Sequence, residues 1–182
     1  TSALREAISW AARQGLRVLQ ILPVNATGGD SSPYNLLSAM ALEPSTIATT
    51  PEELADLSPR DFAEITAKYD LAGLRADGVK YREVHALKTE LLEAAWRSFQ
   101  AKPTFDRQVR AWKDFVSEQA DWLPDHALHR ALIHWHGDDE VATGWPEEHR
   151  SPTAARAWLA KMDPRPRHDF ENRRDFYSYV QW

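Results

Sequence analysis

A single short apolar run, residues 16–22, is the one confident strand candidate in this chain. It is too short for an ordinary helix, lies between Gly15 and Pro23, and alternates weakly, as expected of a strand buried on both faces. A helical pattern over residues 2–14 precedes it, and a polar, glycine-rich loop over residues 25–34 follows it. Helix, tight turn and strand together indicate an α/β repeat, in which ligands bind at the loop after the carboxyl end of the strand.

The rest of the sequence has helical patterns. Residues 36–42 are expected to form a helical turn packed beneath the loop. Thr50-Pro51 and Ser58-Pro59 each place a capping side chain directly before a proline at the first helical position, which predicts two short helices, the second ending near Tyr69. Amphipathic patterns predict further helices at residues 81–99, 105–122, 124–135, 151–162 and 169–182, with connections at residues 70–80 and 138–150. A parallel sheet needs several strands, so the single strand is expected to be a sheet edge without its neighbours.

Charge and composition exclude several classes of partner. A net charge of −5 and a pI near 5.8 leave no basic stripe for the phosphates of a nucleic acid. The 182 residues include no cysteine, which excludes disulfides, thiol catalysis and thiolate metal sites. No apolar run approaches the roughly 20 residues of a membrane span. We therefore expect a cytoplasmic protein without nucleic acid or membrane partners, and the sequence does not indicate its oligomeric state.

The segment around the predicted strand resembles the amylomaltases, also called disproportionating enzymes or 4-α-glucanotransferases. In that family the first barrel strand and its loop follow a pattern close to W-Q-[IV]-L-P-[LV]-x-x-T-G-x-x-x-S-P-Y, with a later S-A-x-A-x-x-P. Two departures are visible: Leu19 replaces the aromatic residue before the glutamine, and the run from Thr27 to Ser31 lacks the aromatic residue of the family's T-G-Y-G-D. The match has no gap and consists of Gln20, Ile21, Leu22, Pro23, Val24, Thr27, Gly28, Ser32, Pro33, Tyr34, Ser38, Ala39, Ala41 and Pro44.

Further matches follow in the family's order along the chain. Residues 122–132 resemble the family's W-L-x-D-Y-A-L-F-x-A-L-K helix. Trp145-Pro146 and the run Val79 to Tyr81 resemble its W-P and V-D-Y elements, and residues 176–182 resemble the helix before its second barrel strand. The resemblance therefore covers nearly the whole chain.

The resemblance implies an α/β parent fold, the TIM (β/α)8 barrel. Residues 1–49 would form the first barrel helix, strand and substrate-side loop, and residues 50–182 a helical insertion leading toward the second barrel strand. It also implies a 4-α-glucanotransferase that transfers α-1,4-glucan segments between maltooligosaccharides by a retaining mechanism, without a cofactor. The family's nucleophile Asp, acid/base Glu and stabilising Asp lie on later strands, so no catalytic residue is expected here. Both ends fall inside helical patterns, and we expect an amino-terminal fragment that is inactive alone.

Asp30, Ser32 and Tyr34 are the candidate substrate-binding residues of the loop. Sugars are bound by polar groups that match their hydroxyls together with an aromatic face, and this loop offers both. The resemblance implies that Ser32 and Tyr34 lie close to bound sugar and that Tyr81 contacts glucan outside the catalytic centre, although a half-buried ring at a helix start is the alternative for Tyr81. Asp30 is not expected to be catalytic, because retaining chemistry needs two carboxyl groups about 5 Å apart. Glu43, the acid nearby in sequence, is expected to face solvent.

Histidines, glycines and tryptophans have structural interpretations. His126 and His129, which replace the family's Tyr and Phe, are three residues apart without an H-E-x-x-H motif, so no metal site is expected. Gly28-Gly29 lacks phosphate-loop spacing and indicates a sharp turn. Two other functions remain open: a self-standing helical interaction domain, and a non-catalytic homologue that binds glucan. Core packing is predicted for the tryptophans on apolar helical stripes, Trp96, Trp112, Trp135 and Trp158.

Overall fold

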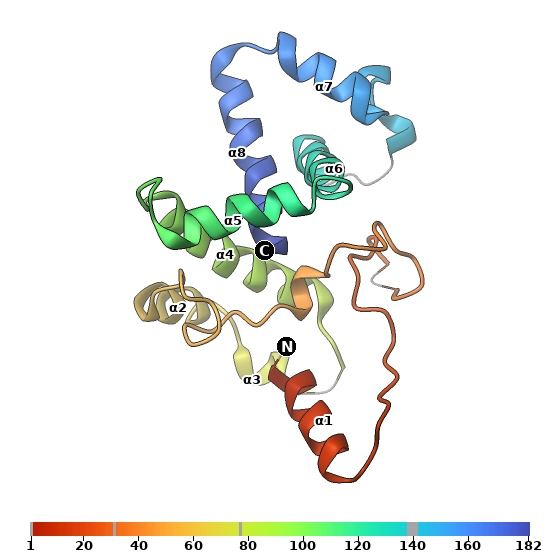
Figure 1. The fold of residues 1–182 in the computed structure, drawn as a ribbon, viewed down its shortest axis with the longest axis vertical. Helices are drawn as coiled ribbons and strands as arrows, with labels where there is room; N and C mark the ends of the chain where they lie inside the picture. The colour runs from red at the N-terminus through yellow and green to blue at the C-terminus, as the bar shows by residue number, and fades with distance from the viewer. Residues whose placement is uncertain (1, 31, 77, 138–141) are drawn as a thin grey trace. The chain divides into compact units, whose positions relative to one another are not determined.

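The computed structural model describes residues 2–30, 32–76, 78–137 and 142–182 (Figure 1). The chain forms two compact units, Thr1–Phe99 and Gln100–Trp182. Within the described residues both units are helical or irregular, and none of the helices is long and apolar enough to cross a membrane. The elements are α1 (Ser2–Arg13), η1 (Pro44–Thr46), α2 (Pro59–Thr66), α3 (Leu71–Leu74), α4 (Tyr81–Gln100), α5 (Arg107–Glu118), α6 (Leu123–Trp135), η2 (Ala142–Gly144), η3 (Glu147–His149), α7 (Pro152–Lys161) and α8 (Pro164–Gln181).

The strand predicted at residues 16–22 is not confirmed. After α1 the chain turns at Gly15, whose φ is +78°, and runs on without regular secondary structure (Figure 1). A strand exists only when its backbone N–H and C=O groups pair with a neighbouring strand, and the described residues include no such strand. The apolar side chains expected of a strand are present, but no sheet buries them. Their exposed fractions are 52% for Leu16, 83% for Val18, 43% for Leu19, 48% for Ile21 and 57% for Leu22.

The helical turn predicted at residues 36–42 is wrong. This segment instead runs antiparallel to the residues before the loop, with isolated bridges between Asn25 and Leu42 and between Thr27 and Leu36. Between the bridges, the Ala26 N–H donates to the Ala41 carbonyl at 2.8 Å. Backbone groups that bond across the loop are not available for helical bonds to residues four positions away. The result is an irregular hairpin that closes the loop at its base.

Of the two short helices that capping residues predict in the first unit, one is present. α2 begins after Ser58, whose Oγ accepts the Asp61 N–H at 3.0 Å, and it ends at Thr66, three residues before the predicted end. The helix predicted at Thr50-Pro51 is wrong: the Leu54 N–H donates to the Thr50 carbonyl at 2.8 Å, but residues 51–53 form only a turn. The connection predicted at residues 70–80 contains the one-turn helix α3, capped by Asp70.

The long amphipathic helix predicted at residues 81–99 is confirmed as α4. Its apolar stripe is spaced three and four residues apart, the period that puts side chains on one face of a helix. The buried side chains of α4 are Leu87, Leu91, Leu92, Ala94, Ala95, Trp96 and Phe99.

The second unit packs α6 against α8 and α7 against η3. α8 begins at Pro164, five residues before the predicted start. Two prolines in its first turn are tolerated there, because the N–H groups at a helix start have no helical acceptor to lose. Leu123 and Ala127 of α6 and Phe170 of α8 are among its most buried side chains.

Only some of the tryptophans occupy the core as predicted. Trp96 is buried, with 7% of its surface exposed, whereas Trp135 is 45% exposed. Trp135 nevertheless makes edge contacts with Trp158 and Phe170, at ring-centroid distances of 5.7 and 5.9 Å. Such aromatic pairs contribute on the order of 1 kcal/mol beyond the area they bury.

Candidate functional site

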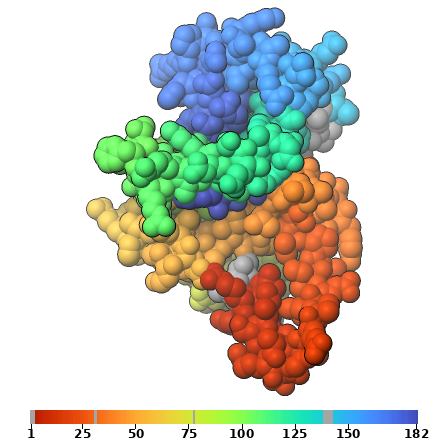
Figure 2. Space-filling view, in the orientation of Figure 1, coloured from red at the N-terminus to blue at the C-terminus, as the bar shows by residue number. Residues whose placement is uncertain are grey.

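The candidate site is the 28–35 loop, which the irregular hairpin closes at its base. The Gly28 N–H donates to the Asn35 carbonyl at 3.0 Å, directly beside the bridge between Thr27 and Leu36. Both ends of the loop are therefore held together. The loop lies at the surface, within the orange part of the chain in the space-filling view (Figure 2).

Asp30 organises the interior of the loop. Its Oδ1 accepts the Ser32 N–H at 3.0 Å, and its Oδ2 accepts the side-chain amide of Asn35 at 3.2 Å. The Asn35 N–H in turn donates to the Ser32 carbonyl at 3.0 Å. A carboxylate that bonds to its own loop two residues on is a common way of fixing a turn. The structure thus gives Asp30 a role in shaping the loop.

Tyr34 projects from this loop into solvent. The residue is 77% exposed, while its backbone N–H lies 3.4 Å from the hydroxyl oxygen of Ser32, which is half-buried. The predicted residues of the loop are therefore brought together, with Tyr34 exposed and the Ser32 hydroxyl beside the Tyr34 backbone.

Tyr81 lies on a separate element, at the first residue of α4, and its side chain is 47% exposed. His85 follows one turn later, on the same face of the helix. Its Nε2 lies 3.4 Å from Oε1 of Glu43, and the other oxygen of Glu43 contacts Thr27 at the base of the loop. Glu43 and His85 therefore connect the base of the 28–35 loop to α4, the helix that begins at Tyr81.

Glu43 is the residue of the site that the sequence prediction placed wrongly. It was expected to face solvent, but only 7% of its surface is exposed. Its Oε1 accepts the Ser45 N–H at 3.1 Å and caps η1, and its Oε2 accepts the Thr27 N–H at 3.2 Å. An acceptor directly before proline is the same start signal that predicts α2 from Ser58-Pro59, and Glu43-Pro44 carries it too. That signal could have located the cap, but not the bond to Thr27.

His126, His136 and His149 of the second unit are partly or fully buried and serve packing. Burial lowers the pKa of His126 to about 4, and the positive charges of Arg130 and His129 lower it as well. His136 and His149 lie 2.8 Å apart between Nε2 and Nδ1. Burial, together with His136, lowers the pKa of His149. Within the described residues, no three His, Cys, Asp or Glu side chains are grouped so that they could hold a metal ion.

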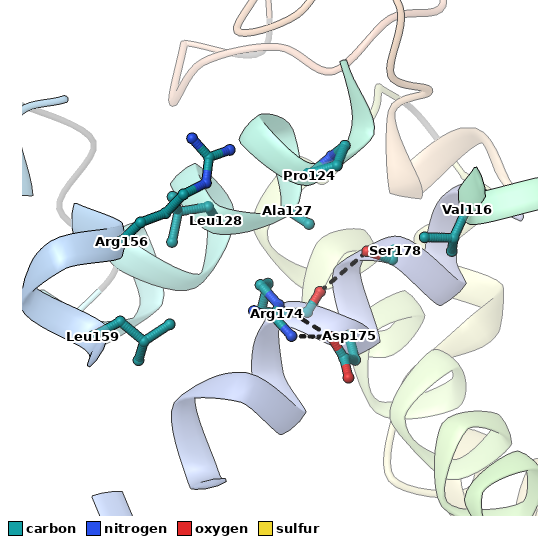
Figure 3. A pocket seen from close by; sticks show the side chains of 9 residues that line it. All are labelled: Val116, Pro124, Ala127, Leu128, Arg156, Leu159, Arg174, Asp175 and Ser178. Carbon is teal, nitrogen blue, oxygen red and sulfur yellow. Dashed lines mark hydrogen bonds and ion pairs between the residues drawn. The ribbon is translucent and has the colours of Figure 1, made fainter. Parts of the chain in front are cut away.

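The second unit also contains a cavity of about 190 Å³ between α5, α6, α7 and α8 (Figure 3). Its two guanidinium groups are already neutralised: Arg174 donates to Asp175 at 2.9 Å, and Arg156 pairs with Asp125. The cavity holds none of the predicted site residues and carries no net charge that would select a ligand. Its lining residues are Val116, Pro124, Ala127, Leu128, Arg156, Leu159, Arg174, Asp175 and Ser178.

Comparison with known proteins decides the family. A family profile described as 4-alpha-glucanotransferase matches residues 1–182. The chain belongs to the 4-alpha-glucanotransferase family. This confirms the resemblance inferred from the strand, loop and helix motifs.

Curated relatives with the same description are similar over most of the chain. A 4-alpha-glucanotransferase of Chlamydia caviae is 27% identical over 180 residues, covering 96% of this chain and 31% of the relative. That of Chlamydia pneumoniae is 29% identical over 140 residues, covering 77% and 26%. That of Thermus thermophilus is 31% identical over 133 residues, covering 73% and 25%. The chain therefore spans between a quarter and a third of the length of these relatives.

Proposed function

We propose that the protein to which this chain belongs is a 4-α-glucanotransferase, which transfers α-1,4-glucan segments between maltooligosaccharides with retention of configuration. The match of the 4-alpha-glucanotransferase family profile to all 182 residues carries this proposal. Retaining transfer uses two carboxyl groups about 5 Å apart, one as nucleophile and one as acid and then base. These groups are assigned to later barrel strands, and the chain alone is expected to be inactive.

In this proposal residues 1–49 are the first barrel helix, strand and substrate-side loop of a (β/α)8 parent, and residues 50–182 are a helical insertion. The exposure of residues 16–22 supports it. Five apolar side chains in seven residues are 43–83% exposed, which is unfavourable in water at about 25 cal/mol per Å² of apolar surface. In the barrel, neighbouring strands would pair their backbone groups, and the barrel interior and outer helices would bury their side chains.

The glucan-binding role is assigned to Ser32, Tyr34, Asp30 and Tyr81. Tyr34 supports it best, because the residue is 77% exposed and a tyrosine ring can offer a flat apolar face to the C–H surface of a glucose unit. The Ser32 hydroxyl and the Asp30 carboxylate lie on the same loop, and both groups can bond sugar hydroxyls. Tyr81 would bind a more distant part of the chain. A cytoplasmic location is part of the proposal.

Product analysis of the full-length protein tests the function. Incubated with maltotriose, a glucanotransferase releases glucose and builds a ladder of longer maltooligosaccharides, because the maltosyl unit left on the enzyme passes to the 4-hydroxyl of another oligosaccharide rather than to water. Glucose and maltose without longer products would indicate a hydrolase. Binding of maltoheptaose without turnover would indicate a non-catalytic homologue, and neither binding nor turnover would favour a helical interaction domain.

A further inference from the structure

Glu43 is a buried carboxylate that holds three segments of the first unit together. It accepts hydrogen bonds from Thr27 before the loop and from Ser45 in η1, and its Oε1 lies 3.4 Å from Nε2 of His85 in α4. Burying a carboxylate is costly unless hydrogen bonds and a positive partner compensate it. Here two backbone N–H groups donate to the carboxylate, and the Thr27 hydroxyl lies 3.4 Å from Oε2. The carboxylate thus fixes the relative positions of its partners.

A second bond fastens the same segment to α4. Lys88 lies three residues after His85, on the same side of the helix, and its Nζ donates to the Ile47 carbonyl. Burial lowers the pKa of Lys88, as expected for an ammonium group enclosed beside this segment. Residues 43–47 are therefore bound to α4 at both ends, by His85 at Glu43 and by Lys88 at Ile47.

The bond from Glu43 to Thr27 acts at the point where the loop begins. Thr27 is the last residue before Gly28, and its partner in the hairpin is Leu36. The bonds of Asp30 fix the inner shape of the loop, but they do not tie it to the rest of the unit. The contact with Glu43 does, because the same carboxylate reaches α4 one turn after Tyr81.

We propose that Glu43 is a positioning residue for glucan binding: through Thr27 and His85 it fixes the 28–35 loop relative to the first turn of α4, so that Tyr34 and Tyr81 bind one glucan chain. The inference rests on the proposed function. Glu43 itself touches no sugar in this arrangement, since its carboxylate is buried and its oxygens are engaged with the protein.

Kinetics of the full-length enzyme separate positioning from mere stabilisation. Glu43→Gln keeps the size of the side chain but removes the charge facing His85 and one acceptor. We expect the KM for maltoheptaose to rise about five- to tenfold, about 1 kcal/mol, with kcat within about twofold. Glu90→Gln is the matched control, because Glu90 accepts from Lys68 and Tyr69, both at 2.6 Å, away from the loop. It is expected to leave KM unchanged.

A double-mutant cycle gives the decisive result. If Glu43 acts through the position of Tyr34, the variant carrying Tyr34→Ala and Glu43→Gln has the KM of Tyr34→Ala alone. Multiplicative effects of the two substitutions would overturn the proposal. A wild-type enzyme without any glucan turnover would instead overturn the proposed function.

Hydrogen exchange tests the same link without activity. We expect Glu43→Gln to speed amide exchange in peptides covering residues 24–36 and to leave α6 peptides at the wild-type rate. Unchanged exchange in both regions contradicts the positioning role. If Glu43→Gln does not fold, His85→Phe breaks the link to α4 while leaving the bonds to Thr27. It is expected to raise KM in the same way, and an unchanged KM overturns the proposal.

Discussion

His126 makes the stability of the second unit depend on pH. Its pKa is about 4 in the folded chain, against an ordinary value of 6.5. As the pH falls below 6.5, the unfolded chain binds a proton at this site while the folded chain does not, so the free energy of unfolding falls. The contribution of His126 to the free energy of unfolding is fully present above pH 6.5 and is lost as the pH falls toward 4. At 1.36 kcal/mol per pH unit, the loss by about pH 5 is about 2 kcal/mol.

Urea denaturation of wild type and His126→Phe, at about pH 7 and about pH 5, measures this loss. Phenylalanine fills the half-buried site with a ring that cannot be protonated, so the variant should gain about 2 kcal/mol relative to wild type between the two pH values. His168→Phe is the control, because it removes an exposed histidine of α8 and should follow the wild-type curve. If His126→Phe and wild type lose the same stability on acidification, the assignment of a buried neutral His126 is refuted.

Two further predictions concern the first unit. Leu91→Ala should lower the free energy of unfolding by about 2–5 kcal/mol, because Leu91 is 2% exposed and its loss leaves a cavity; a change below about 1 kcal/mol in urea denaturation would contradict this burial. Ser58→Ala should cost about 1 kcal/mol by removing the cap of α2; thermal unfolding unchanged from wild type would show that the cap contributes nothing.

Helices were predictable from the sequence where the signal is local. The cap at Ser58 and the apolar stripe of α4 lie within the segments they specify, and both predictions are confirmed. The start predicted at Thr50-Pro51 failed because a cap followed by proline begins a turn as readily as a helix, and no apolar stripe follows it.

Features that depend on distant partners could not be predicted in this way. Residues 36–42 were expected to be helical, but they pair with residues 24–27, a choice that the local sequence does not encode. Glu43 was placed in solvent because its partners, Thr27 and His85, are far away in sequence. The loop carrying Asp30, Ser32 and Tyr34 was located by its residue types, its place after the predicted strand and the family resemblance. The hydrogen bonds that hold it emerged only from the fold.

The donor KM of the full-length protein carrying Tyr34→Ala tests the central claim most directly, namely that the 28–35 loop of this chain binds glucan. Phe105→Ala is its matched control, since Phe105 is 76% exposed and Tyr34 is 77% exposed. Loss of a stacking ring should raise the KM for maltotriose about tenfold, about 1.4 kcal/mol, while Phe105→Ala keeps the wild-type value. Equal KM values for wild type and both variants would contradict the claim.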